Sequence, residues 1–248
     1  MIALLSDFQQ TDYAGVVKGV IYSLNPKAQI VDLTNSIYSE NILQGAWILK
    51  INYRFFPKKT IFLCVVDPGV GGKRKAIAVE TKNYWFVGPD NGLMELAAKE
   101  DGIKNVYEIQ PDKKWKVSIT FHGRDLFAKI AAILDQGKKT NLKKINTPLI
   151  KANYHQKERE GQIVNMDTYG NIVTNIPSLE KNKYKVSYDG LEALIDVHKN
   201  YESAKEDELF ILTGSNNTLE FSVKNKSALE KFEIELAKPI IGKKIKME

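Results

Sequence analysis

Three side chains with complementary acid–base chemistry lie in glycine-rich segments of this chain. Asp67 directly follows the apolar run 61–66, which predicts a buried strand. Arg74 comes seven residues later, after a proline and three glycines that favour tight turns, and His122 lies far downstream. A carboxylate, a fixed positive charge and an imidazole at strand ends can hold and activate a water molecule. The structural alternative is a surface ion pair of Asp67 with Arg74, with His122 packing in a loop.

Two further carboxylates occur near the N-terminus. Asp7 ends the predicted strand 2–5, and ligands of open α/β sheets bind beyond the carboxyl ends of strands. A carboxylate at that place can accept hydrogen bonds from both hydroxyls of a ribose. Asp12 precedes the predicted helix 13–24 and is either its cap or a ligand contact.

Two turn-forming segments in the second half carry polar side chains of interest. Asp-Thr-Tyr-Gly-Asn at 167–171 is typical of a β-turn, and 214–220 is typical of a hairpin. Asn171 offers both a donor and an acceptor to a ligand. A turn or hairpin without any function remains the alternative for both segments.

The elements that must position these residues predict two domains. Short apolar runs alternate with helical patterns in residues 1–152, which favours an α/β domain with a largely parallel sheet and the catalytic residues. A lysine-rich passage, 138–160, is interpreted as a connection between the domains. Residues 161–248 show short β-runs with turn signals, which predict a smaller antiparallel β domain. The strands expected are 2–5, 30–33, 61–66, 76–80, 85–87, 163–166, 184–188, 191–195, 209–212 and 219–223; the helices expected are 13–24, 42–53, 92–99 and 125–134.

Composition excludes several classes of protein. The net charge is +6, but the lysines are scattered among Glu and Asp without a stripe of Arg and aromatic residues, so we expect no nucleic-acid partner. No apolar run approaches the roughly 20 residues of a membrane span, and the N-terminus does not resemble a signal peptide. The lone Cys64 excludes an internal disulfide, and the three histidines lack metal-ligand spacing. We expect a cytoplasmic protein that has no cofactor and no metal.

Taken in order, the motifs resemble the SAM hydroxide adenosyltransferase family, whose members include SAM hydrolases and whose relatives are fluorinases and chlorinases. The resemblance runs nearly from end to end. The segments that carry it are Ser-Asp-Phe at 6–8 with Asp-Tyr at 12–13, Val-Asp-Leu-Thr at 31–34, Val-Val-Asp-Pro-Gly-Val-Gly at 65–71, Phe-Val-Gly-Pro-Asp-Asn-Gly at 86–92, Thr-Phe-His-Gly-Arg-Asp at 120–125, Asp-Thr-Tyr-Gly-Asn-Ile-Val-Thr-Asn at 167–175, and Gly-Ser with Leu-Glu at 214–220.

The resemblance implies hydrolysis of S-adenosylmethionine (SAM), with release of adenosine and L-methionine after water or hydroxide attacks C5′. It implies that Asp67, Arg74 and His122 hold the attacking water and that Asp7 binds the ribose. It further implies a homotrimer, with each site between the α/β domain of one subunit and the β domain of its neighbour. The substrate-binding residues that it implies are Asp7, Asp12, Asp67, Asp167, Asn171, Ser215, Glu220 and Val223.

The chain departs from the family pattern in informative places. Gly123 stands where the fluorinase pattern has a halide-binding serine, which favours hydroxide over halide as the nucleophile. Residues 223–228 read Val-Lys-Asn-Lys-Ser-Ala where relatives often have Val-Asn-x-Gly-Ser-Ala, and Asn35 replaces a common histidine. Two alternatives stay open: a halogenase-type adenosyltransferase, and a non-catalytic protein that binds adenosine or SAM. The sequence leaves open which sulfonium epimer is the substrate.

Overall fold

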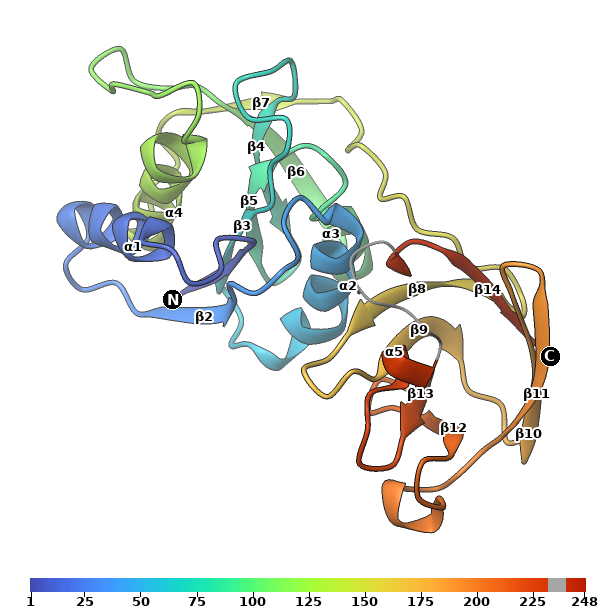
Figure 1. Cartoon of the computed structure of the whole chain (residues 1–248). Helices are drawn as coiled ribbons and strands as arrows, with labels where there is room; N and C mark the ends of the chain where they lie inside the picture. Colours follow the sequence, from blue (N-terminus) through green and yellow to red (C-terminus); the bar gives the residue numbers. More distant parts are fainter. Residues whose placement is uncertain (232–239) are drawn as a thin grey trace. The chain divides into compact units, whose positions relative to one another are not determined.

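The computed structural model describes residues 1–231 and 240–248, and it divides into two compact units (Figure 1). Unit 1 comprises Met1–Ala152 and unit 2 comprises Asn153–Glu248. Each unit is built on its own seven-stranded sheet. In the described part of the chain, no helix combines the length and apolar character needed to cross a membrane.

Unit 1 contains a mixed sheet with strand order β2-β1-β3-β5-β4-β6-β7. Its first four strands in this order pair in parallel, whereas β5, β4, β6 and β7 pair antiparallel. The strands are β1 (Ile2–Ser6), β2 (Ile30–Thr34), β3 (Ile61–Val65), β4 (Ala76–Thr81), β5 (Trp85–Pro89), β6 (Ile103–Ile109) and β7 (Leu142–Ile145).

The expectation of a largely parallel sheet is therefore wrong, although the α/β class is right. Only the three residues 82–84 separate β4 from β5, and so short a connection permits only an antiparallel hairpin. The sequence reading also missed β6 and β7. Strand β7 lies within the lysine-rich passage interpreted as a connection, where it forms a charged edge strand of unit 1.

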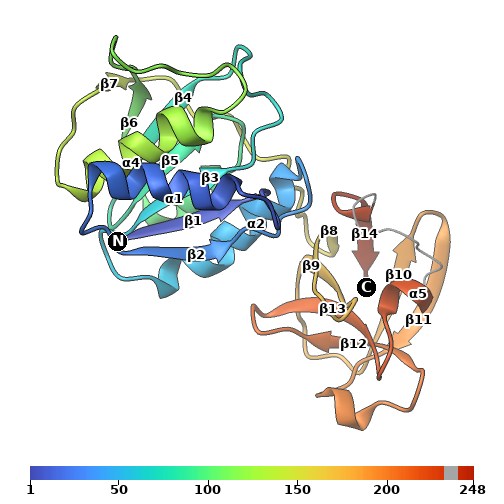
Figure 2. The ribbon, with the colours of Figure 1, turned by 60° about the vertical axis from the view of Figure 1, so that its left-hand side comes forward.

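Helices cover both faces of this sheet, as Figure 2 shows. Successive side chains of β1 point to opposite faces of the sheet and so belong to two hydrophobic clusters. Ile2 and Leu4 pack with α1 and α4, whereas Ala3 and Leu5 pack with α2 and α3. The helices are α1 (Tyr13–Leu24), α2 (Ile42–Asn52), α3 (Glu95–Asp101) and α4 (Ala128–Asp135), the last preceded by a π-helical turn, Gly123–Phe127.

Unit 2 is an antiparallel sheet with order β11-β10-β14-β8-β9-β13-β12, which confirms the expected antiparallel β architecture. A bridge between Val197 and Ile211 brings its two edges close, so the sheet is nearly a barrel. The strands are β8 (Glu160–Met166), β9 (Ile172–Pro177), β10 (Lys183–Tyr188), β11 (Leu191–Asp196), β12 (Leu209–Thr213), β13 (Thr218–Val223) and β14 (Lys244–Met247), and the short helix is α5 (Ala228–Lys231).

The end of β3 is fixed by the neighbouring strand and its turn. Asn91 donates from Nδ2 to the carbonyl oxygen of Val66 at 2.8 Å, immediately before Asp67. Gly88 on β5 lies against the backbone of Cys64 on β3, where a Cβ atom would overlap the Cys64 carbonyl oxygen. The segment 86–92 thus supports the loop that carries Asp67.

We expect Gly88→Ala to destabilise the protein by roughly 1–3 kcal/mol, because the added methyl group forces two buried strands apart. Gly15→Ala is the matched control, since a Cβ atom at Gly15 in α1 meets nothing within 4 Å. That control should stabilise the helix by roughly 0.5–1 kcal/mol. Urea unfolding measures both effects, and equal stability of the two variants would contradict the proposed strand contact.

Candidate active site

Asp67, Arg74 and His122 lie in one hydrogen-bonded row in unit 1. Arg74 Nε donates to Asp67 Oδ1 at 3.0 Å and to Oδ2 at 3.1 Å, and Arg74 Nη2 also donates to Asp67 Oδ2. The same Nη2 lies 2.7 Å from His122 Nδ1. The side chains of Arg74 and Asp67 are 9% and 6% exposed, so this is a buried ion pair, in contrast to the surface pair that was the structural alternative.

The contact with Arg74 fixes the protonation state of His122. A guanidinium group has only donors, so Nδ1 must accept the hydrogen bond and the proton of the neutral ring lies on Nε2. Burial, followed by the positive charge of Arg74, lowers the pKa of His122 below its usual value, while Asp67 and Asp125 act in the opposite direction. The neutral imidazole is therefore a hydrogen-bond donor at Nε2.

His122 is held by the unusual start of the helix that follows it. It occupies the N-cap of the π-helical turn Gly123–Phe127, and such turns are frequent at functional sites. The ring contacts Phe127 edge to face, with centroids 6.4 Å apart, and the Arg74 guanidinium lies over the same Phe127 ring at 5.5 Å. Arg124 and Asp125 form a separate ion pair, with 2.7 Å between Nε and Oδ1.

Asp67 and His122 line a cavity of ≈ 250 Å³, which we call the Asp67 cavity. Asp7 lines it as well, from the loop directly after β1. Asp7 Oδ2 accepts a hydrogen bond from the Glu40 backbone N–H at 2.8 Å, and burial raises the pKa of the Asp7 carboxyl. The remaining lining residues are Phe8, Ser39, Glu40, Val65, Pro68, Val70, Thr120, Phe121 and Gly123.

A second hollow of ≈ 490 Å³ shares Asp7 and Phe121 with the Asp67 cavity. Its apolar wall is a cluster of Phe8, Tyr13 and Phe121, with ring centroids 5.1–6.0 Å apart. Asp12 lies between two of its lining residues, at the start of α1, and its exposed side chain makes no capping hydrogen bond within the described structure. The cap interpretation of Asp12 is therefore not supported.

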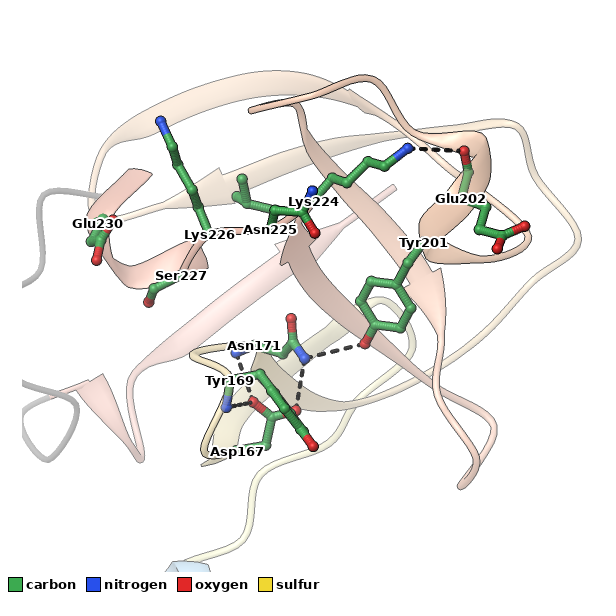
Figure 3. A pocket seen from close by; sticks show the side chains of 11 residues that line it. Asp167, Tyr169, Asn171, Tyr201, Glu202, Lys224, Asn225, Lys226, Ser227 and Glu230 are labelled. Atoms are coloured by element: carbon green, nitrogen blue, oxygen red, sulfur yellow. Dashed lines mark hydrogen bonds between the residues drawn. The ribbon is translucent and has the colours of Figure 1, made fainter.

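Asp167 and Asn171 lie together in a pocket of ≈ 830 Å³, which we call the unit 2 pocket (Figure 3). Asp167 Oδ1 accepts from the backbone N–H groups of Tyr169 and Asn171, both at 2.9 Å. Asn171 Nδ2 donates to Asp167 Oδ2 at 2.7 Å and to the Tyr201 hydroxyl at 3.1 Å. The remaining lining residues are Glu202, Val223, Lys224, Asn225, Lys226, Ser227 and Glu230.

The other residues expected in unit 2 differ in position. Val223, at the end of β13, lines the unit 2 pocket. Glu220 on β13 is partly buried, and burial and then the charge of Asp167 raise the pKa of its carboxyl. Its carboxylate lies against Gly214, and Glu220 is not among the pocket-lining residues. Ser215 is exposed in the turn between β12 and β13 and is not among the pocket-lining residues.

Tyr201 is one of the pocket residues that sequence reasoning missed. It belongs to the 3-10 turn Tyr201–Ser203, where it follows an asparagine in a polar loop with no motif around it. Its ring contacts Phe210 edge to face at 5.9 Å, and its hydroxyl meets Asn171, thirty residues earlier in the chain. Nothing in its local sequence marks it, because only the fold brings it to Asn171.

The fold and the site define a protein with an α/β unit, an antiparallel β unit and a ligand-sized polar pocket. Sequence comparison supplies the family. The model for the SAM hydroxide adenosyltransferase N-terminal domain matches residues 2–145, and that for the C-terminal domain matches residues 161–241. The chain belongs to the SAM hydroxide adenosyltransferase family, as the order of its motifs predicts.

Named relatives are similar over much of the chain. An (R)-S-adenosyl-L-methionine hydrolase of Methanocaldococcus jannaschii is 35% identical over 182 residues, which are 71% of this chain and 66% of that protein. One of Thermus thermophilus is 29% identical over 253 residues, covering 96% and 98%. A fluorinase of Nocardia brasiliensis is 24% identical, covering 76% and 75%. The crystal structure of an uncharacterized conserved protein from Thermotoga maritima matches with a TM-score of 0.89 and 32% identity, covering 100% of both chains.

We expect turnover to fall on the acid side with a midpoint below 6.5, because protonation of His122 Nδ1 breaks its hydrogen bond with Arg74. His122→Asn retains a polar side chain but cannot titrate, so it should be slower and lose this acid limb. Rate measurements from pH 4.5 to about 8 check this expectation. A His122→Asn profile that keeps the wild-type limb would show that another group titrates.

Proposed function

We propose that this protein hydrolyses S-adenosyl-L-methionine to adenosine and L-methionine. The observation that carries the proposal is the shared guanidinium group of Arg74, which joins Asp67 to His122 beside the Asp67 cavity. The relatives named (R)-S-adenosyl-L-methionine hydrolase support the same reaction. Asp67, Arg74 and His122 are the catalytic residues in this proposal.

The proposed chemistry is a substitution at C5′ of the adenosyl group. The oxygen of a water molecule forms a bond to C5′ while the C5′–S bond breaks, and its electron pair neutralises the sulfonium. One proton of the water passes to the Asp67 carboxylate, which lines the cavity, and the products are adenosine and the thioether of methionine. The sulfonium is already a good leaving group, so the protein's main task is to hold the water in line with the C5′–S bond.

The hydrogen-bonded residues Asp67, Arg74 and His122 supply complementary contacts for holding this water. The neutral His122 ring can donate from Nε2 to the water oxygen, and the Arg74 charge favours hydroxide character in the attacking oxygen. The carboxylates of Asp67 and Asp7 favour a cationic substrate in the Asp67 cavity. The aromatic cluster of Phe8, Tyr13 and Phe121 forms an apolar wall of the adjoining hollow.

We propose substrate-binding roles for residues of unit 1 and, separately, for residues of unit 2. Asp7 is proposed to accept hydrogen bonds from the ribose hydroxyls and Asp12 to contact the methionine ammonium. The unit 2 pocket has the volume of a small-molecule site, and the faces of Tyr169 and Tyr201 suit a planar base. Asp167, Asn171, Ser215, Glu220 and Val223 are proposed to bind the adenine and amino-acid portions.

Halogenation is the weaker candidate, for a steric reason at Gly123. A Cβ atom at this position would lie 3.2 Å from Val65 Cγ1 and 3.3 Å from the Phe8 ring. A serine side chain would therefore need Val65 or Phe8 to move.

We also propose that the protein acts in the cytoplasm as a homotrimer.

The reaction is tested by incubating the protein with the (R) and (S) sulfonium epimers of SAM, with and without chloride, followed by chromatography. We expect adenosine and methionine in equimolar amounts, formed faster from the (R) epimer that the relatives' names specify. A halogenated adenosine would indicate the halogenase alternative. Unchanged SAM despite measurable binding would indicate a binding protein without catalysis.

Asp67→Asn should lower the rate of SAM hydrolysis by roughly 10²–10⁴-fold, because the row loses the charge that orients Arg74 and the water. Adenosine binding should remain measurable by calorimetry. Asp32→Asn is the matched control. Asp32 lies on the exposed edge strand β2, and its carboxylate pairs with Lys18 of α1. Full activity of the purified Asp67→Asn protein would remove Asp67 from the mechanism.

A further inference from the structure

The turn that follows β13 is tied to the loop that carries Tyr201. Lys224 Nζ donates to the carbonyl oxygens of Glu202 at 3.3 Å and of Ala204 at 3.1 Å. Figure 3 shows the Lys224 side chain reaching Glu202, while Tyr201 points its hydroxyl at Asn171. Tyr201 and Glu202 on this loop and Lys224 on the turn all line the unit 2 pocket.

Lys224 differs from the two residues that follow it. Asn225 Nδ2 lies 3.2 Å from a Glu206 carboxylate oxygen, and Lys226 Nζ lies 3.2 Å from Asp207 Oδ1. Both are exposed contacts between side chains, which contribute little to stability. Lys224 is partly buried and binds main-chain oxygens instead, so it restrains the backbone on the C-terminal side of Tyr201.

Side chains on two strands and the turn's own cap hold Tyr201. Its ring meets Phe210, its hydroxyl meets Asn171 and the Ser222 side chain, and Asn200 caps its 3-10 turn by accepting from the Ser203 backbone N–H at 3.0 Å. The carbonyl groups at the end of such a turn need donors, and a lysine ammonium group near a helical C-terminus satisfies them. Lys224 provides this donor for Glu202 and Ala204.

We propose that Lys224 is a positioning residue of the unit 2 pocket, which holds Glu202–Ala204 so that Tyr201 stays against Asn171 and offers its ring to the base of the ligand. The identity of this ligand as an adenosyl group rests on the proposed function, whereas the restraint of the loop does not. The segment 223–228 is also where this chain departs from the usual family pattern.

The restraint is tested with Lys224→Met, which keeps the aliphatic stem and removes the donors. Lys231→Met is the matched control, because it removes the same charge from an exposed lysine that pairs with Asp207 and does not line the pocket. Hydrogen exchange at the backbone amides of residues 201–204 should accelerate in Lys224→Met and stay at the wild-type rate in Lys231→Met. Equal exchange in both variants and the wild type would overturn the restraint.

The effect on the ligand is measured as adenosine affinity by calorimetry on the full-length protein. We expect Lys224→Met to weaken binding by about tenfold, Lys231→Met by less than about twofold, and Lys224→Arg to recover most of the loss. In a Tyr201→Ala background, Lys224→Met should have almost no further effect, because Lys224 acts through Tyr201. Equal losses from both lysine variants, or an undiminished effect without Tyr201, would overturn the positioning role.

Thermal unfolding of every variant separates loss of fold from loss of position. If Lys224→Met unfolds below the assay temperature, Lys224→Gln takes its place, since it also removes the charge but retains a polar group. A wild-type protein that neither binds adenosine nor cleaves SAM would contradict the proposed function. The amide exchange of residues 201–204 would still decide whether Lys224 restrains the loop.

Discussion

The guanidinium group of Arg74 is the interaction on which the site in unit 1 depends. It donates to both carboxylate oxygens of Asp67 and to His122 Nδ1, and the ion pair is almost completely removed from solvent. Burying two charges is costly unless their hydrogen bonds are well made, and removal of one partner leaves the other uncompensated. The surrounding structure meets this condition by fixing each partner from a different element.

The two units hold the residues of their candidate sites in different ways. In unit 1, the end of β3 is held by Asn91 and Gly88, and the π-helical turn holds His122. The result is a rigid electrostatic arrangement beside a small cavity. In unit 2, short strands and polar turns surround a larger pocket, whose walls are joined by side-chain contacts such as that of Lys224. The first arrangement suits the control of a reacting oxygen, and the second suits recognition of a larger planar group.

Local patterns predicted most elements of the fold, with informative exceptions. Helix α1 matches its predicted range, and the bounds of β1, β3 and β10 lie within one or two residues of the ranges predicted for them. The reason is that the apolar periodicity of these segments reflects their burial. Strands β6 and β7 were missed because their side chains are largely polar or partly exposed near the sheet edge. Strands β9 and β14 of unit 2 were missed as well. The number of parallel strands was overestimated, because the direction of a strand depends on its connections and its pairing partners. A local apolar run in the sequence does not indicate either of these.

The sequence by itself determined the residue types at the strand ends, the order of the motifs and hence the family. Its resemblance to the family also singled out Asp67, Arg74 and His122 together. Only the tertiary structure decided that Arg74 binds His122 through Nδ1 across 48 residues of chain, which places the ring proton on Nε2. It alone brought Tyr201 to Asn171 and Lys224 to the carbonyl oxygens of Glu202 and Ala204. The reason is that hydrogen bonds between distant side chains depend on how strands pair and where loops end, and neither leaves a local pattern in the sequence.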